Sequence, residues 1–364
     1  MNGLAGRIAE AVRASGPMSL ERFWNIALFD RQDGYYTSRT PIGAAGDFTT
    51  APEISQMFGE LIGAWLVAAW RELGAPAPFA LAEFGPGRGT LMADILRTAR
   101  QIDLGFMRAA RVRLIETSDR LAAEQAQRLL RFDLPILRVR RLAEIEAMPL
   151  LLVANELFDA VAIRQYSFDG RNWRERLVGL GDDGFVFIQG EPAFNLAVPG
   201  EAPAAGAIYE ASPLREAIAT ELGVRIAAKS GAALIVDYGH ARSDFGDTLQ
   251  ALRAHDFADP LTEPGRHDIT SHVDFERLGA AITAGGAKIS PVMNQGAFLL
   301  FLGLAERAGI LGRDADDGER AAIEAAVRRL AGEGPGEMGA LFKVVAAASA
   351  PLALPPFVGR GRLD

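Results

Sequence analysis

From Pro78 onward, short apolar runs alternate with segments of helical periodicity, and this alternation constrains the fold of the 364-residue chain more than any other feature. The order strand, helix, strand is typical of a parallel sheet whose strands are joined by crossover helices. The sequence therefore predicts an α/β fold with a mostly parallel sheet. We expect its strands at residues 80–84, 112–116, 136–139, 150–154, 232–238, 287–293 and 341–347.

Three regions lie outside this alternation of predicted strands and helices. Residues 1–75 read as helical, with helices expected at 4–14, 19–30 and 52–73, and form a predicted N-terminal cap. The sheet domain is expected over residues 76–350, with insertions at about 164–204 and 240–273 and a tail at 351–364. The first insertion alternates apolar and polar residues around Gly181-Asp-Asp-Gly184, which predicts an antiparallel hairpin. The second carries all four histidines and is expected to form a lid.

A glycine-rich loop follows the first predicted strand and precedes a helix. Its residues are Gly85-Pro86-Gly87-Arg88-Gly89-Thr90, and Glu83 lies two positions before it. Glycines permit a tight turn and a close backbone approach to a ligand, and the helix N-terminus presents free N–H groups. A dinucleotide-binding fold would place glycine at position 90. We therefore expect Glu83, Gly85, Pro86, Gly87 and Gly89 to bind S-adenosylmethionine, although a glycine turn in any α/β fold is the simpler alternative.

Polar residues also follow two later strands, where ligands of such sheets bind. Glu116 is expected to accept hydrogen bonds from both ribose hydroxyls of the cofactor. Asn155 and Glu156 follow the fourth strand, where the methyl acceptor is expected to meet the cofactor, and we expect Asn155 to bind the cofactor. Two acids here, Glu156 and Asp159, could hold a guanidinium. The alternative for Asp159 is a helix cap or a loop salt bridge.

Two further candidates lie outside the sheet. His272, with Asp274 nearby, could take the proton of the acceptor, although a lone loop histidine is more often structural. Asp47 and Thr49, in a long aperiodic loop, could fold over the cofactor from the N-terminal side or serve only the structure.

Composition excludes several classes of protein. The chain has no cysteine, and its histidines follow no zinc-binding spacing, so we expect no metal site. A net charge of −8 argues against non-specific nucleic-acid binding. The N-terminus lacks a signal-peptide pattern, and the apolar stretch 344–358 is short and contains prolines. We expect a cytoplasmic protein without membrane insertion.

Six spaced motifs together resemble the MidA-like family, from about residue 5 to about residue 350. The motifs span residues 46–60, 83–90, 155–160, 237–240, 268–275 and 295–299. The resemblance implies a class I methyltransferase with a Rossmann-like, seven-stranded sheet, helices on both faces, an N-terminal helical cap and an inserted substrate region. The mitochondrial members of the family are arginine methyltransferases that assist assembly of respiratory complex I.

The function that we expect is thus methylation of an arginine on a partner protein, such as a respiratory complex I subunit. Two alternatives remain open. One is a small-molecule methyltransferase, which would have a closed acceptor pocket. The other is a non-catalytic assembly chaperone that retains the fold as a binding module. The resemblance implies the mitochondrial matrix for the eukaryotic members.

Overall fold

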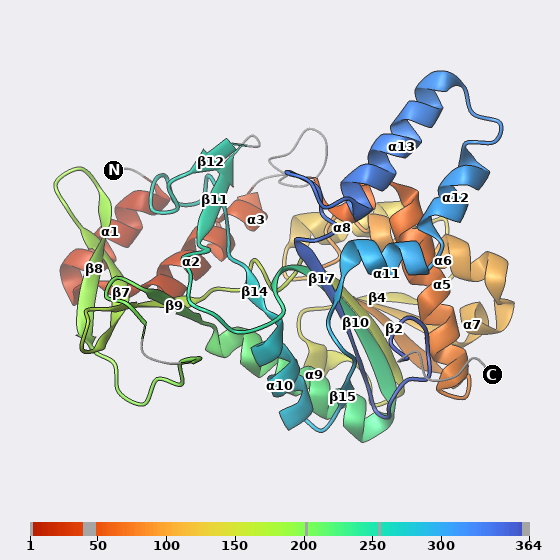
Figure 1. Cartoon of the computed structure of the whole chain (residues 1–364), viewed down its shortest axis with the longest axis horizontal. Helices are drawn as coiled ribbons and strands as arrows, with labels where there is room; N and C mark the ends of the chain where they lie inside the picture. Colours follow the sequence, from red (N-terminus) through yellow and green to blue (C-terminus); the bar gives the residue numbers. More distant parts are fainter. Residues whose placement is uncertain (1–2, 39–48, 201–202, 254–255, 359–364) are drawn as a thin grey trace. The chain divides into compact units, whose positions relative to one another are not determined.

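The computed structural model describes residues 3–38, 49–200, 203–253 and 256–358 (Figure 1). Its contacts divide the chain into two compact units, and each is built from separate stretches of sequence. The first unit comprises Met1–Phe48, Phe158–Ala217 and Arg242–Asp274. The second unit comprises Thr49–Leu157, Ile218–Ala241 and Phe275–Asp364.

The second unit contains the main sheet, in the order β15-β17-β10-β5-β2-β3-β4. Strands β10, β5, β2, β3 and β4 pair in parallel, whereas β17 is antiparallel to β10. This arrangement confirms the predicted α/β fold. The strand bounds are β2 Phe79–Phe84, β3 Ala110–Ile115, β4 Ile136–Val139, β5 Leu150–Asn155, β10 Gly231–His240, β15 Lys288–Ile289, β16 Met293–Asn294 and β17 Phe342–Ala348.

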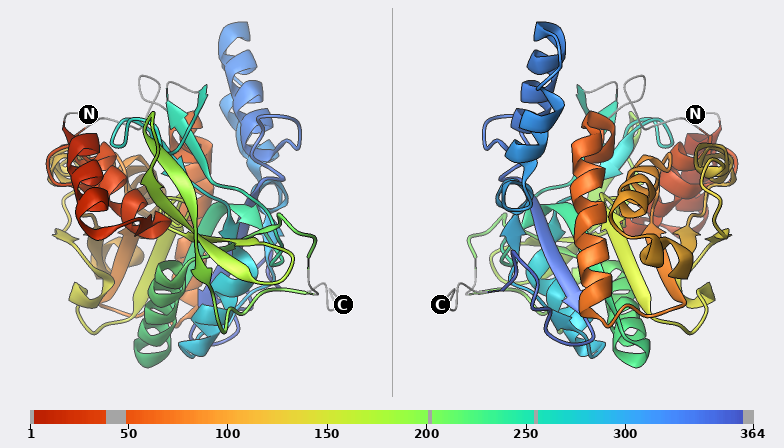
Figure 2. Two further views of the ribbon diagram at one scale, coloured as in Figure 1. Left: turned by 90° about the vertical axis from the view of Figure 1, so that its left-hand side faces the viewer. Right: turned by 90° about the vertical axis from the view of Figure 1, so that its right-hand side faces the viewer.

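Helices cover both faces of this sheet, so its central strands are apolar throughout. Every residue of β5 is buried, as expected for a parallel strand with helices above and below it. Figure 2 shows α5 and α6 over one face and α9 and α10 over the other. The helices are α4 Ala51–Ile54, α5 Gln56–Glu72, α6 Thr90–Ile102, α7 Leu104–Ala109, α8 Asp119–Leu129, η1 Leu142–Glu144, α9 Pro213–Lys229, α10 Phe275–Ala284, α11 Gln295–Phe301, α12 Leu304–Leu311 and α13 Asp317–Ala331.

Two predicted elements differ from the structure. The strand expected at 287–293 is wrong: β15 and β16 are two short pieces that pair with β17 on either side of Pro291. Proline has no N–H to donate to a strand ladder, which explains the interruption. The helix expected at 52–73 is divided at Ser55, which has an extended backbone and whose hydroxyl accepts a hydrogen bond from Met57 N to cap α5.

The first unit combines short helices with two small sheets. One sheet has the order β1-β7-β6-β9 with β8 beside β7, and the other has the order β12-β11-β13. The predicted hairpin is confirmed, since Gly181 N donates to Gly184 O at 2.8 Å between β7 and β8. The elements are α1 Leu4–Ser15, β1 Met18–Ser19, α2 Leu20–Phe29, α3 Tyr35–Ser38, β6 Arg164–Phe168, β7 Trp173–Leu180, β8 Phe185–Pro192, β9 Ile208–Ala211, β11 Gln250–Arg253, β12 Asp256–Ala258, β13 Asp268–Thr270 and β14 Val273–Asp274.

Helix α2 supplies much of the core of this unit. Ser19 caps it by accepting a hydrogen bond from Arg22 N at 3.2 Å, and Phe23, Trp24 and Leu28 are completely buried. Trp24 Nε1 donates to Ala160 O at 3.0 Å, so the apolar ring is buried with its polar atom satisfied.

The contacts of α5 do not follow the predicted division into a cap at 1–75 and a sheet domain at 76–350. This helix belongs to the second unit, where it packs against α6, whereas α1 and α2 belong to the first unit. The predicted domain boundaries therefore stay a prediction. Among the described helices, none has the combination of length and apolar character that a membrane span requires.

Candidate functional site

The glycine loop joins β2 to α6 through three left-handed backbone conformations. The φ angles are +69° at Gly85, +51° at Gly87 and +79° at Gly89, which is the N-cap of α6. Gly89 N donates to Pro86 O at 2.7 Å and closes the turn. Because L side chains rarely adopt these angles, the loop requires glycine at these positions.

Neighbouring side chains pack closely on this loop. A Cβ at Gly85 would lie 2.9 Å from Leu157 Cδ1, and one at Gly89 would lie 3.4 Å from Gln125 Cα. The loop is thus held between the end of β5 and helix α8. Its backbone has little room to rearrange.

Glu83 lies near the end of β2, two positions before Gly85, and is 3% exposed. The backbone N–H of Met92 in α6 donates to its carboxyl group, but Oε2 has no hydrogen-bond partner within the described part of the chain. Burial, together with the charges of Glu116 and Asp94, raises the pKa of Glu83 to about 8. A cation placed against this carboxyl group would favour its ionised form.

Glu116 directly follows β3, one strand away from the loop. Its Oε1 accepts a hydrogen bond from Ser118 N at 2.7 Å, and its Oε2 accepts one from Gln125 Nε2 at 3.0 Å. Burial raises the pKa of this carboxyl group, while these two hydrogen bonds act in the opposite direction. Its carboxylate is thus fixed in position by two donors.

The end of β5 places Asn155 and Glu156 in the same unit as the loop. Glu156 has a φ of +51°, which is uncommon for a residue with a side chain. Its Oε1 accepts hydrogen bonds from Ala51 N at 2.9 Å and from Asn155 Nδ2 at 3.0 Å. Asn155 Oδ1 is buried and lacks a partner among the residues that the structure describes. A strained acid with a neighbouring unsatisfied amide is typical of a functional position.

Asp159 and His272 belong to the first unit, where Arg215 connects their backbones. The Arg215 guanidinium donates to Asp159 O at 3.1 Å and to His272 O at 2.7 Å, and to Ser271 Oγ at 2.7 Å. Arg215 and Asp159 are both buried. The structure therefore brings Asp159 and the 271–272 segment together, but their catalytic roles stay predictions.

The remaining candidates lie on the N-terminal side. Thr49 precedes α4 in the second unit and is half-buried. Asp47 lies outside the described residues. Within the described ranges no group of three or more acids and histidines is arranged to hold a metal ion.

The sequence analysis did not identify three polar residues of this region as site candidates. Glu53 of α4 contacts Thr90 and Arg88 on both sides of Gly89. Asp237 of β10 is fully buried and accepts a hydrogen bond from Leu157 N at 3.1 Å. Gln125 occupies the buried face of α8 between Leu121 and Leu129, and a polar residue inside an apolar helical stripe is a signal that could have revealed it.

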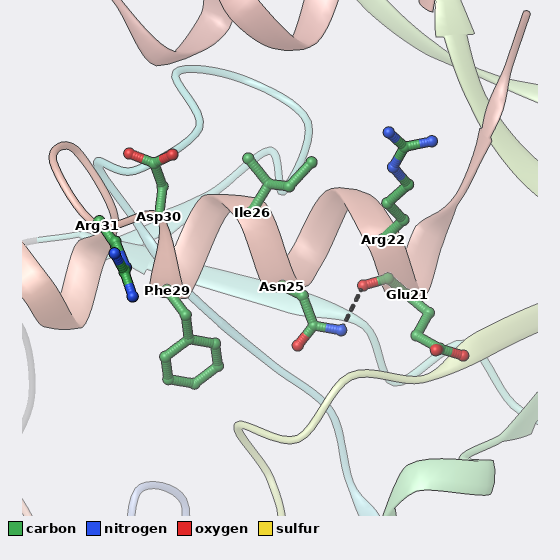
Figure 3. Close-up of a pocket in the computed structure, with 7 residues that line it drawn as sticks. All are labelled: Glu21, Arg22, Asn25, Ile26, Phe29, Asp30 and Arg31. Atoms are coloured by element: carbon green, nitrogen blue, oxygen red, sulfur yellow. Dashed lines mark hydrogen bonds between the residues drawn. The ribbon is translucent and has the colours of Figure 1, made fainter. Parts of the chain in front are cut away.

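A separate open hollow of about 620 Å³ runs along α2 in the first unit (Figure 3). None of the predicted site residues lines it. Its lining consists of Glu21, Arg22, Asn25, Ile26, Phe29, Asp30 and Arg31.

The residues around the loop match the chemistry of S-adenosylmethionine. Its ammonium and sulfonium groups are cations, which buried carboxyl groups attract, and its ribose hydroxyls and amines can donate to carboxylate and amide oxygens. Glu83 Oε2 and Asn155 Oδ1 are buried acceptors without a donor within the described ranges, and Glu116 provides a fixed carboxylate. The donor and acceptor set thus fits this cofactor.

Comparisons with known proteins agree with this chemistry. Residues 61–292 match the model of a family described as "Putative S-adenosyl-L-methionine-dependent methyltransferase". The mitochondrial protein arginine methyltransferase NDUFAF7 homolog of Drosophila melanogaster is 34% identical over 334 residues, which cover 81% of this chain and 74% of that protein. The mitochondrial protein arginine methyltransferase NDUFAF7 of Homo sapiens is 32% identical over 329 residues, covering 82% and 73%.

A solved structure extends the likeness to the fold and the ligand. A protein from Burkholderia thailandensis bound to S-adenosyl-homocysteine aligns with a TM-score of 0.81 and 26% identity, covering 95% of this chain and 91% of that one. The fold, the glycine loop and these likenesses define a class I methyltransferase that uses S-adenosylmethionine. The chain belongs to the family whose model it matches, together with the NDUFAF7 proteins that it resembles.

Proposed function

We propose that this methyltransferase transfers the methyl group to an arginine side chain of a partner protein. The observation that carries the proposal is the likeness to protein arginine methyltransferases, at 32–34% identity over about four fifths of the chain. The family resemblance found in the sequence adds a respiratory complex I subunit as the candidate partner. We propose that the reaction is cytoplasmic if the source is bacterial, whereas the relatives are named as mitochondrial.

Within this proposal, the cofactor is held by the second unit. The backbone of Gly85, Pro86, Gly87 and Gly89 lines its amino-acid and ribose portions. Glu83 faces its cationic end, Glu116 accepts from the ribose hydroxyls, and Asn155 Oδ1 accepts a further hydrogen bond. Thr49, which precedes α4 in the same unit, contacts it from the N-terminal side. Bound S-adenosylmethionine supplies an electrophilic methyl group.

The proposed acceptor grip is Glu156. A guanidinium is protonated in water and pairs with carboxylates, so a fixed acid can orient it and hold its positive charge away from the attacking nitrogen. The strained backbone of Glu156 and the two hydrogen bonds on its Oε1 support this role, because they restrict where the carboxylate can lie. The roles of Asp159 as a second acid and of His272 as the acceptor of the nitrogen's proton stay predictions from the sequence alone.

The test is a methylation assay with cofactor labelled in its methyl group. The purified protein is incubated with lysate from a strain that lacks it, and labelled material is hydrolysed to identify the modified residue. Methylated arginine in a protein band supports the proposal. Label confined to small molecules would point to a small-molecule methyltransferase, and cofactor binding without any transfer would point to a binding module; either result overturns the arginine assignment. A Glu116→Ala variant is the control for background labelling.

A further inference from the structure

Gln125 of α8 contacts two separate parts of the cofactor cradle. Its Nε2 donates to Gly87 O in the glycine loop at 2.7 Å and to Glu116 Oε2 at 3.0 Å. The residue is 1% exposed, so these contacts are shielded from water. A single side chain thus connects the loop after β2 to the acid after β3.

The orientation of this amide follows from its partners. Gly87 O and the Glu116 carboxylate are both acceptors, so only the amide nitrogen can face them. The reversed amide would place its oxygen against two acceptors. With Nε2 donating to both acceptors, Oε1 has no hydrogen-bond partner within the described ranges.

The position of Gln125 also argues for a role beyond packing. Its helical neighbours on the same face, Leu121 and Leu129, are buried apolar residues, and a leucine here would continue the stripe. Burying an amide costs free energy unless its hydrogen bonds compensate for lost water. A glutamine at this position therefore implies a requirement for its polar contacts.

We infer that Gln125 is a positioning residue that locks the glycine loop to Glu116 and orients the Glu116 carboxylate for the cofactor ribose. The inference rests on the proposed role of Glu116. The hydrogen bond from Gln125 is one of the contacts that lower the pKa of Glu116 against the opposing effect of burial. Without that donor, the carboxylate would lose part of what stabilises its charge and one of its two fixed contacts.

Other charged groups surround the pair and must be considered in any pH experiment. Arg138 donates to Glu116 O at 2.8 Å and favours the ionised carboxylate, whereas Glu83 lies close enough to interact unfavourably with it. On α8, Glu124 pairs with Arg120 and lies 3.7 Å from Arg88 Nε. Because these groups are shared by every variant, the ratio of variant to wild-type Kd isolates the effect of position 125.

The decisive variant is Gln125→Glu, which has the same shape and a titratable group. At low pH its carboxyl is protonated and can donate to Glu116, whereas at high pH two carboxylates repel each other. A protonated carboxyl has a single O–H, so it can restore the contact with Glu116 but not the one with Gly87. We expect a Kd for S-adenosylmethionine about 3- to 10-fold weaker than wild type at pH 5.5 and about 10- to 100-fold weaker at pH 8.5. Gln125→Met keeps the side-chain volume but donates no hydrogen bond. Its Kd for S-adenosylmethionine should exceed that of wild type by about the same factor at every pH.

Gln127→Glu is the matched control, because it is the same substitution on the exposed face of the same helix. Its Kd ratio should stay near one across the pH range. Calorimetric titration measures each Kd, and circular dichroism at each pH establishes that the variant is folded. Should Gln125→Glu unfold at high pH, the Met variant carries the test alone.

The outcomes distinguish the inferred role of Gln125 from the proposed ribose contact of Glu116. A Kd ratio for Gln125→Glu that does not change with pH, or a folded Gln125→Met that binds as wild type does, would overturn the role of Gln125. If Glu116→Gln also binds normally, the proposed ribose contact itself fails. If Glu116→Gln binds weakly while the Gln125 variants bind normally, only the inference about Gln125 fails.

Discussion

The hydroxyl of Thr90 donates a hydrogen bond to the carboxylate of Glu53, which lies 37 positions earlier in the chain. Arg88 Nη1 contacts the other oxygen of the same carboxylate at 3.4 Å. Glu53 therefore holds the residues on both sides of Gly89. In the sequence, Thr90 was informative only because it is not glycine; in the structure, its hydroxyl anchors the loop to α4.

Thr90→Val should weaken cofactor binding by about 1 kcal/mol, because it removes a hydrogen bond to a charged partner while keeping the side-chain shape. Glu53→Gln should act through the same contact. Calorimetry on both single variants and the double variant measures their coupling, which we expect at about 0.5–2 kcal/mol. Strictly additive effects would show that the Thr90–Glu53 contact does not support the loop.

Gly85→Val should abolish measurable cofactor binding. The left-handed backbone at Gly85 disfavours a β-branched residue, and its Cβ would lie 2.9 Å from Leu157 Cδ1. Gly74→Val is the matched control: its φ is +84°, but a Cβ there meets nothing within 4 Å. Both variants should lose stability in thermal unfolding, and only Gly85→Val should lose binding. Normal binding by a folded Gly85→Val would exclude the loop as the cofactor cradle.

Glu116→Ala should weaken cofactor binding by about 1.5–3 kcal/mol, since hydrogen bonds to a charged acceptor contribute about that much. This corresponds to a loss of about 10- to 150-fold in affinity, measured by calorimetry. An unchanged Kd in the folded variant would remove Glu116 from the site.

Glu156→Gln should separate transfer from cofactor binding. The substitution keeps the shape and the backbone strain but removes the negative charge, so methylation should fall by about two to three orders of magnitude while the cofactor Kd stays near wild type. Asp159→Asn should have a smaller effect if Asp159 mainly supports the turn. Retained activity in Glu156→Gln would refute its role as the acceptor grip.

The unfolding free energy should fall as pH rises from about 4.5 to about 8 because of Glu83. Its pKa is raised from 4.5 to about 8, so in this window the folded chain binds more protons than the unfolded chain, and stability decreases with increasing pH. Glu83→Gln should remove a slope of at most about 1.4 kcal/mol per pH unit. Denaturant unfolding of both proteins between pH 5 and 8 tests this; equal slopes would mean that Glu83 does not titrate there.

The amino-acid sequence determined the local elements of the sheet and the glycine loop. Apolar runs such as 150–154 specify buried strands, and Gly85, Gly87 and Gly89 meet the backbone requirements of a turn, because both depend on neighbouring residues alone. Acids that end strands, such as Glu116, follow from the same pattern. These signals are local, so they can be read without knowing the fold.

Contacts between distant segments were decided only by the tertiary structure. The hydrogen bonds of Glu53 with Thr90, of Gln125 with Gly87 and of Ala51 with Glu156 join residues 37, 38 and 105 positions apart. Periodicity cannot predict them, because they depend on which helices and strands pack together. The packing of α5 with α6 has the same origin. Local patterns thus specify the elements of this methyltransferase, whereas packing of the whole chain decides which polar groups meet around its cofactor loop.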